Sequence, residues 1–217
     1  MKKIALTAVV AAALAGCVSA PTKPIASNAS LHGKRLVLSE YAKPDFAAMT
    51  AGKAEFGLFG ALATIHAGNE LVKSDNIADP AIDIGQQLAK DLATRDADTV
   101  MPGPTTPSAN DNPSTLIKTY PGADLIIDVK TINWMYAYYP TKWSLYHINY
   151  AARVRLLDGS TGAIVAQQMC KVEDPTDPKK SPTRAALTAD HGALLKQLLK
   201  KAGDSCVENF EHQVLKV

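Results

Sequence analysis

Two stretches decide the fold of this chain: GADLIIDV at residues 122–129 and YHINYAARVRL at residues 146–156. The first opens an apolar run that continues to residue 134, a pattern typical of a buried strand. In the second, apolar and polar residues alternate, which predicts a strand with one face on a core and one in water. DGSTG at residues 158–162 then predicts a tight turn, and residues 163–172 pair back as a third strand. Together they predict a C-terminal β-meander.

Helical patterns lie on both sides of this meander. Asp79 and Pro80 are a capping residue and a first helical residue, and leucines at every fourth position follow them. Shorter elements are expected as a strand at 35–38, a strand at 99–101, a loop at 102–113 and a helix ending near Tyr120. A final helix of about 25 residues, with a leucine-rich face, follows a proline-rich loop. The expected fold class is α+β: a single domain at residues 34–217 with a mostly antiparallel sheet, a C-terminal β-meander and helices packed on one face.

Residues 47–72 form a long apolar stretch whose centre, FGLFGALA at 56–63, is apolar on every side. A helix of that kind is either buried or in contact with another apolar surface. The stretch is therefore interpreted as a core helix, with contact to a second subunit or to a bilayer as the alternatives. The charged or titratable side chains of Glu55, His66 and Glu70 argue against a transmembrane span.

The first residues have the pattern of an export signal. Lys2 and Lys3 precede eleven uncharged, mostly apolar residues, a stretch too short to cross a bilayer but typical of a cleaved signal peptide. The stretch ends in Leu14-Ala15-Gly16-Cys17, which resembles the lipobox of bacterial lipoproteins. The resemblance implies a signal peptide at 1–16, acylation of Cys17 and a flexible tether at 17–33. Val18 after the cysteine implies sorting to the outer membrane. The alternative is an ordinary secretory signal with a chance cysteine.

Composition agrees with an exported globular domain. Removal of the first 16 of 217 residues would leave 201, and loss of Lys2 and Lys3 would lower the formal net charge from +2 to 0. The charge balance therefore gives no reason to expect a nucleic-acid partner. With Cys17 assigned to lipid, Cys170 and Cys206 are an even pair in an oxidising compartment. We predict a disulfide between them, with two buried free thiols as the alternative.

The chain has no recognisable catalytic, cofactor or metal motif. Its five histidines include no H-x-x-x-H pair, and there is no nucleophile elbow, phosphate-binding loop or dinucleotide fingerprint. GSTG at 159–162 is explained by the hairpin turn. We therefore expect no enzyme activity, no cofactor and no metal.

Aromatic residues gather around the connection between the first two meander strands. Both tryptophans and five of the seven tyrosines lie between residues 134 and 150. Five of them flank the hairpin end and form the candidate binding surface: Trp134, Tyr136, Tyr138, Tyr139 and Trp143. Rings of this kind are favoured at protein interfaces, membrane surfaces and sugar platforms. The alternative is a local core under the loop.

A second resemblance covers the mature domain. The glycine-rich apolar helix, the proline-capped helix, GADLIIDV and RLLDGSTGAIV at 155–165 resemble small envelope lipoproteins of the curli-secretion and TolB N-terminal type. The resemblance implies an α+β domain with an accessory or assembly role. We therefore expect a non-enzymatic lipoprotein, anchored in the outer membrane, that binds another envelope protein or a second copy of itself. A lipoprotein that binds sugar or lipid through the aromatic cluster is the alternative.

Overall fold

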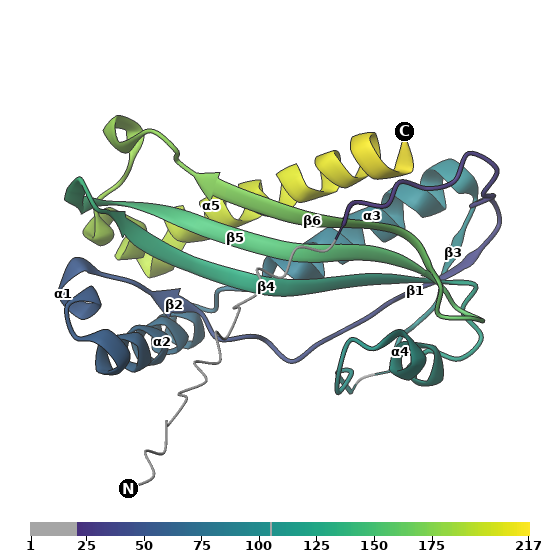
Figure 1. Ribbon diagram of the computed structural model, residues 1–217, viewed down its shortest axis with the longest axis horizontal. Coiled ribbons are helices and arrows are strands. Elements are labelled where there is room, and N and C mark those ends of the chain that lie inside the picture. The colour runs from purple at the N-terminus through teal and green to yellow at the C-terminus, as the bar shows by residue number, and fades with distance from the viewer. Residues whose placement is uncertain (1–20, 105) are drawn as a thin grey trace, which may run out of the picture.

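The computed structural model describes residues 21–104 and 106–217, and a mixed six-stranded sheet lies at its centre (Figure 1). The strand order is β3-β1-β4-β5-β6, and β2 pairs with β4 as well. β4, β5 and β6 pair antiparallel, whereas β1, β2 and β3 join the sheet in parallel. The strands are β1 (Arg35–Leu38), β2 (Ala47–Ala48), β3 (Thr99–Val100), β4 (Leu125–Tyr139), β5 (Lys142–Asp158) and β6 (Ile164–Asp174).

The predicted β-meander is confirmed, and its strands are longer than expected. β4 and β5 pair from Leu125 opposite Asp158 to Tyr139 opposite Lys142. The register shifts between Thr131 and Asn133, so the bulge inserts one residue into β4. Because of this extra residue, Trp134 lies on the same face as Val129 although the spacing between them is odd. Ile132, at the bulge, is 43% exposed.

Helices cover this sheet in two uneven layers. α3 (Pro80–Asp96) and α5 (Arg184–Phe210) pack on the face that holds the main hydrophobic cluster. The expected start of α3 is confirmed, because the Asp79 carboxylate accepts a hydrogen bond from the backbone of Ala81 at 3.0 Å. α4 (Pro113–Thr119) covers a smaller cluster around Leu116. The α+β fold is thus confirmed, with α4 as one helix outside the main helical layer (Figure 1).

The apolar stretch is two helices where one was expected. α1 (Ala51–Ala54) is followed by α2 (Gly57–Ser74), and Gly57 has a φ of +53°, which favours glycine. Gly60 lies where α1 crosses α2: a Cβ there would be 1.8 Å from the Lys53 carbonyl oxygen. Gly68 lies where α2 meets the segment before β2, with Phe46 O at 2.0 Å from a Cβ. The glycines therefore allow close backbone contact.

The final helix is also interrupted. Asp190, His191 and Gly192 all have positive φ between 50° and 67°, so α5 is a short first helix and a long second one. A short 3₁₀ turn, η1 (Pro178–Lys180), precedes α5, and a π-helical turn, η2 (Glu211–Leu215), ends it. The leucine face of α5 is buried as expected, with Leu187, Leu195 and Leu199 in the core.

The segment before β1 differs from the expected tether at 17–33. Lys23 and Gln167 exchange two backbone hydrogen bonds of 2.8 and 2.9 Å, and the backbone N–H of Ile25 donates to Val214 O at 2.9 Å. Farther on, the N–H of Gly33 donates to Asp96 O. The segment is thus joined to the domain at three points: Lys23 pairs with the unpaired edge of β6, and Ile25 and Gly33 donate to carbonyl groups of η2 and α3. Residues 17–20, with Cys17, lie outside the described residues.

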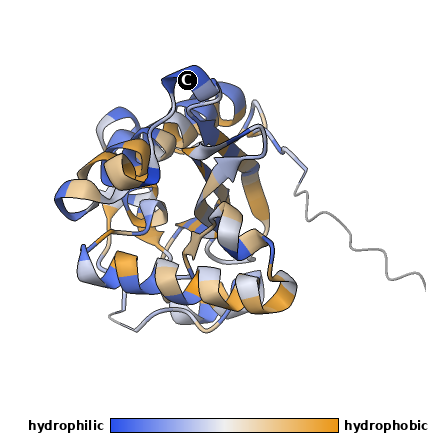
Figure 2. Cartoon of the chain, turned by 90° about the vertical axis from the view of Figure 1, so that its left-hand side faces the viewer, coloured by the Kyte–Doolittle hydropathy of each residue, from blue (hydrophilic) through white to orange (hydrophobic). Residues whose placement is uncertain are grey.

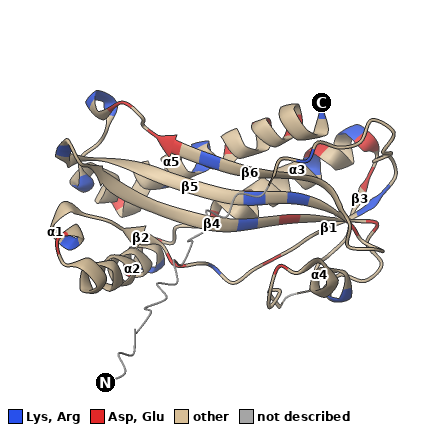
Figure 3. Ribbon diagram, viewed as in Figure 1, with Lys and Arg blue, Asp and Glu red and all other residues tan. Residues whose placement is uncertain are grey.

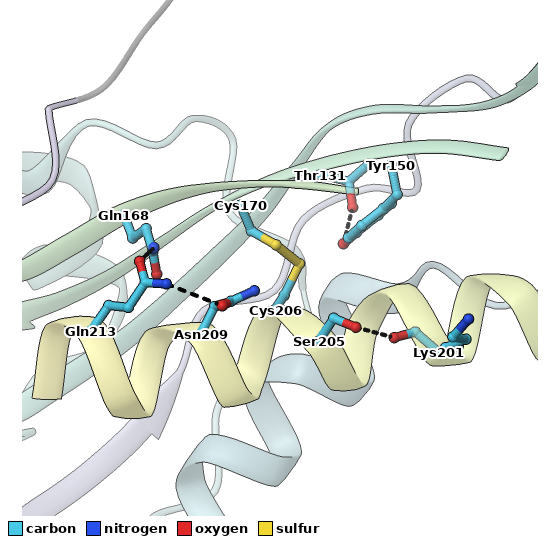
Figure 4. The surroundings of a disulfide bond; sticks show 9 residues. All are labelled: Thr131, Tyr150, Gln168, Cys170, Lys201, Ser205, Cys206, Asn209 and Gln213. Atoms are coloured by element: carbon cyan, nitrogen blue, oxygen red, sulfur yellow. Dashed lines mark hydrogen bonds between the residues drawn. A yellow bond between two sulfur atoms is a disulfide. The ribbon is translucent and has the colours of Figure 1, made fainter. Parts of the chain in front are cut away.

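The predicted disulfide between Cys170 and Cys206 is present and joins β6 to α5 (Figure 4). Both cysteines are buried. A row of amide hydrogen bonds continues the contact: Gln168 donates to Gln213 at 3.0 Å, and Gln213 donates to Asn209 at 3.2 Å. The bond closes a loop that spans 36 residues of sequence and ties the long helix to the sheet.

Removal of this crosslink will destabilise the domain. We expect the double substitution Cys170→Ala/Cys206→Ala to lower the free energy of unfolding by about 3–4 kcal/mol, the loop-closure entropy for this spacing. Urea unfolding monitored by circular dichroism measures the change, and reductant should shift the wild type but not the double variant. Unfolding midpoints of the wild type that coincide with and without reductant would contradict the prediction.

Candidate interaction surface

The most unusual part of the surface is the beginning of α2. Four large apolar side chains, Phe56, Leu58, Phe59 and Leu62, are 69%, 75%, 81% and 60% exposed. We call these four residues the apolar end surface. Figure 2 looks at this end of the molecule and shows the hydrophobic residues along α2 at its lower edge. A contiguous exposed apolar patch of this kind is typical of a site that contacts another molecule.

The exposure follows from which residues α2 buries. Its buried residues are Gly60, Thr64, Gly68 and Val72, spaced by four along the helix. Three of the four are small because the backbone of α2 lies directly on α1 and on the segment at Phe46. The large side chains are therefore on the outward side. The interpretation of this stretch as a core helix is wrong for Phe56, Leu58, Phe59 and Leu62, and the four-residue period of small residues was the signal that could have predicted their exposure.

The structure divides the predicted aromatic surface. Trp134, Tyr136 and Tyr139 are buried, and Tyr138 is half-buried. The Trp134 ring packs edge-on against Phe46 with 5.0 Å between centroids, and its indole N–H donates to Pro44 O at 3.2 Å. Only Trp143 among the five is largely exposed, at 62%. The binding-surface prediction is therefore wrong for the three buried rings. A bulge and segment 44–48 bring Trp134 and Tyr136 into the core, whereas Tyr139 stacks on His147 and is covered by the loop before α5.

Truncation of the two tryptophans should change the free energy of unfolding by very different amounts. We expect Trp134→Ala to lower the free energy of unfolding by about 3–5 kcal/mol, because it empties a fully buried aromatic site. Trp143→Ala should change it by less than about 0.5 kcal/mol, since the ring lies in solvent. Urea titration of both variants tests this, and similar losses for the two would show that the burial difference is wrong.

Basic side chains gather at the same end of the molecule (Figure 3). The segments 50–62, 139–145 and 175–184 contain five basic residues, Lys53, Lys142, Lys179, Lys180 and Arg184, and two acidic ones, Glu55 and Asp177. Burial lowers the pKa of Lys53, and the nearby positive charge of Arg184 lowers it further. Burial raises the pKa of Tyr136 and of Tyr146, and the positive charge of Arg184 acts in the other direction and lowers both pKa values. Arg184 is therefore close to α1 and to the hairpin end.

Hydrogen bonds hold these segments together. The Ser181 hydroxyl donates to the Tyr139 hydroxyl at 3.1 Å, and the backbone N–H of Tyr146 donates to Pro182 O at 2.8 Å. The Trp143 indole N–H donates to Pro140 O at 2.8 Å, which fixes the ring at the hairpin tip. The hairpin tip and the loop before α5 thus form one unit beside the apolar end surface (Figure 1).

A cluster of buried charged and polar side chains lies on the face of the sheet that α3 and α5 do not cover. The carboxylate of Asp128 is fully buried and accepts hydrogen bonds from Ser39 at 2.8 Å, from Arg155 Nε at 2.7 Å and from Tyr41. Arg153 binds both Asp128 and Asp111, at 3.3 and 2.7 Å. Burial raises the pKa of Asp111, but its hydrogen bond and charge interaction with Arg153 lower it more. These hydrogen bonds and ion pairs join the loop at Ser39 and Tyr41 and the loop at Asp111 to the sheet, so the role of the cluster is structural.

Loss of the buried carboxylate charge should be costly. We expect Asp128→Asn to lower the free energy of unfolding by about 3–5 kcal/mol, because Arg155 is left buried without its partner. Asp124→Asn is the matched control: Asp124 pairs with exposed Arg35 at 3.0 Å, so its removal should cost much less. Urea unfolding compares the two variants, and equal losses would contradict the structural role of Asp128.

One internal cavity, of about 160 Å³, lies between segment 38–44 and the beginning of α3. Asp79 and Thr131 are in its wall, and the Thr131 hydroxyl donates to Asp79 at 2.5 Å. Burial raises the pKa of Asp79, while the hydrogen bond from Thr131 opposes this. Ligand pockets usually measure about 300–1,000 Å³. The cavity is thus too small to be the main binding site.

Within residues 21–104 and 106–217, no group of three or more His, Cys, Asp or Glu side chains is placed to hold a metal ion. In the same residues, no helix has the length and hydrophobicity needed to cross a membrane. Larger hollows of about 370–520 Å³ elsewhere on the described residues are more open to solvent than the cavity at Asp79 and Thr131. The apolar end surface, with four exposed large apolar side chains on one short segment, is the strongest candidate site among the described residues.

Comparisons with known proteins give distant likenesses of structure. No protein-family model matches this chain, and no curated protein matches its sequence. It is similar to the hypothetical protein CT253 from Chlamydia trachomatis, with 8% identity, 83% of this chain and 96% of that chain covered, and a TM-score of 0.41. It is also similar to the PelC dodecamer from Paraburkholderia phytofirmans, with 12% identity, 84% of this chain and 91% of that chain covered, and a TM-score of 0.36. A third similar structure is lipoprotein GNA1162 from Neisseria meningitidis, with 11% identity, 81% of this chain and 99% of that chain covered, and a TM-score of 0.30. TM-scores below 0.5 carry no conclusion about the role of this chain.

Proposed function

We propose that this chain is a non-enzymatic lipoprotein of the bacterial cell envelope, anchored in the outer membrane through lipid on Cys17. Its domain is an accessory or assembly module that contacts another envelope component through the apolar end surface. The observation that carries the proposal is the exposure of Phe56, Leu58, Phe59 and Leu62 on one short helical segment. Exposure of such a surface to water is unfavourable in free energy, and burial of the surface against a partner is favourable.

Two further observations support the location. The lipobox-like LAGC at residues 14–17 follows a basic and then an apolar segment, which is the order of a lipoprotein signal. The Cys170–Cys206 disulfide suits an oxidising compartment such as the periplasm. A ligand site built from the aromatic cluster has no comparable support, because three of its five rings are buried.

Lipidation of Cys17 is tested by metabolic labelling. Cells that express the full chain should incorporate labelled palmitate into it, and the mature protein should remain with the outer-membrane fraction. Cys17→Ser should abolish the label and release the domain, because the acyl chains supply the attachment. Ser19→Ala is the matched control and should keep both properties. Unchanged labelling of Cys17→Ser, or mass spectrometry that finds an unmodified mature terminus, would overturn the anchor.

A further inference from the structure

We propose that the apolar end surface docks on a bilayer that contains anionic phospholipid, with the surrounding lysines and arginine on the headgroups. This inference deepens the proposed function and rests on it for the location of the domain. The first support is the combination of side chains. Phe59 and Leu62 supply apolar contact, Trp143 supplies an interfacial ring, and Lys142 lies next to that ring. Bilayer surfaces favour this combination of residues.

Charge supports a lipid surface over a second copy of the chain. Five basic and two acidic residues lie in the three segments at this end, and the neighbouring carboxylates of Glu173 and Asp174 are paired with His147 and Lys201. A twofold contact through this end would bring the basic residues of both copies together, and such like-charge contact is unfavourable. Anionic headgroups, by contrast, attract basic residues within about 10 Å at ordinary salt. An anionic bilayer therefore offers favourable contacts to both the apolar and the basic residues of this end.

The protruding shape of the apolar end surface also favours a bilayer as its partner. The surface consists of the first turns of a helix and the tip of a hairpin, and the hollow between α1 and α2 is shallow and open. Small ligands prefer enclosed concave sites, whereas a protruding apolar segment can enter the headgroup region. Figure 2 shows this apolar helix at the rim of the molecule.

The proposed anchor places the domain within reach of the bilayer. Pro21 is the first described residue, and Lys23 is already hydrogen-bonded to β6. Three residues lie between Cys17 and Pro21, and the four residue-to-residue steps span at most about 14 Å when extended. Lys23 pairs with Gln167, which lies opposite Arg155 of β5, and thirteen residues of β5, about 43 Å, separate Arg155 from Lys142 at the hairpin tip. A lipidated Cys17 and the apolar end therefore contact the same bilayer when the long axis of the domain lies along it.

The experiment uses residues 18–217, the mature chain without its lipidated cysteine. These residues include the sheet, both hydrophobic clusters and the disulfide, and circular dichroism confirms the folding of each variant. Partition into vesicles of phosphatidylethanolamine with one quarter phosphatidylglycerol is measured by flotation, with pure phosphatidylcholine vesicles as the comparison. We expect the wild type to prefer the anionic vesicles at least about fivefold, and this preference to fall as salt rises.

Two variants separate the apolar from the electrostatic contribution. Phe59→Ser/Leu62→Ser should reduce partition into anionic vesicles at least about tenfold, because it removes the apolar contact. Lys179→Gln/Lys180→Gln should reduce it about fivefold or more without affecting neutral vesicles. Ile82→Ser, which changes an apolar residue of α3 that is 49% exposed, is the matched control and should bind as the wild type does.

Trp143 gives an independent signal of contact. Its emission should shift to shorter wavelength on anionic vesicles, because its ring leaves water, and Trp143→Phe should remove the shift while Trp134 stays buried. Equal partition of the Phe59→Ser/Leu62→Ser variant and the wild type, or no binding to anionic vesicles, would overturn the proposal. So would self-association in sedimentation runs that this variant alone abolishes, since the occupant would then be a second copy. Palmitate labelling is independent of all these outcomes.

Discussion

The antiparallel pairing of β4 with β5 is the interaction on which the other elements depend. The two strands pair along nearly their whole length, from Leu125 and Asp158 at one end to Tyr139 and Lys142 at the other. β1 and β2 then pair with β4, and β6 pairs with β5. α3 and α5 pack on the face that this pair presents. A bulge after Thr131 keeps Trp134 on that face, which lets one long strand contribute to a single core.

The length of this hairpin explains how an apolar surface arises at one end. A strand of 15 residues extends about 50 Å. At the hairpin end the core is covered by α2 and by the segment around Phe46, and α1 packs on α2. α2 approaches its neighbours through Gly60 and Gly68, where there is no room for a side chain. Close backbone packing therefore directs Phe59 and Leu62 away from the core.

Charges show the same division between structural and surface roles. Asp128 and Arg155 are buried together, and the further hydrogen bonds of Asp128 to Ser39 and of Arg155 to Asp111 O fix two loops to the sheet. The basic residues at the hairpin end lie on three separate segments and outnumber the acidic ones. The formal net charge of the chain is only +2, so the sum of charges gave no indication of this local excess. Only the fold brings Lys53 close to Arg184.

The sequence by itself determined the elements whose signals are local. Alternation at 146–156 determined a strand, Asp79 and Pro80 determined the beginning of α3, and the pair Cys170 and Cys206 indicated a disulfide. Tertiary structure decided the rest. Trp134 and Tyr136 became core because a bulge and β2 enclose them, and the segment before β1 is joined to the domain because β6, η2 and α3 accept hydrogen bonds from Lys23, Ile25 and Gly33. Phe59 became surface because backbone contact at Gly60 left no space beneath α2. Hydrophobicity is a property of a residue, whereas burial depends on which neighbours the whole fold supplies.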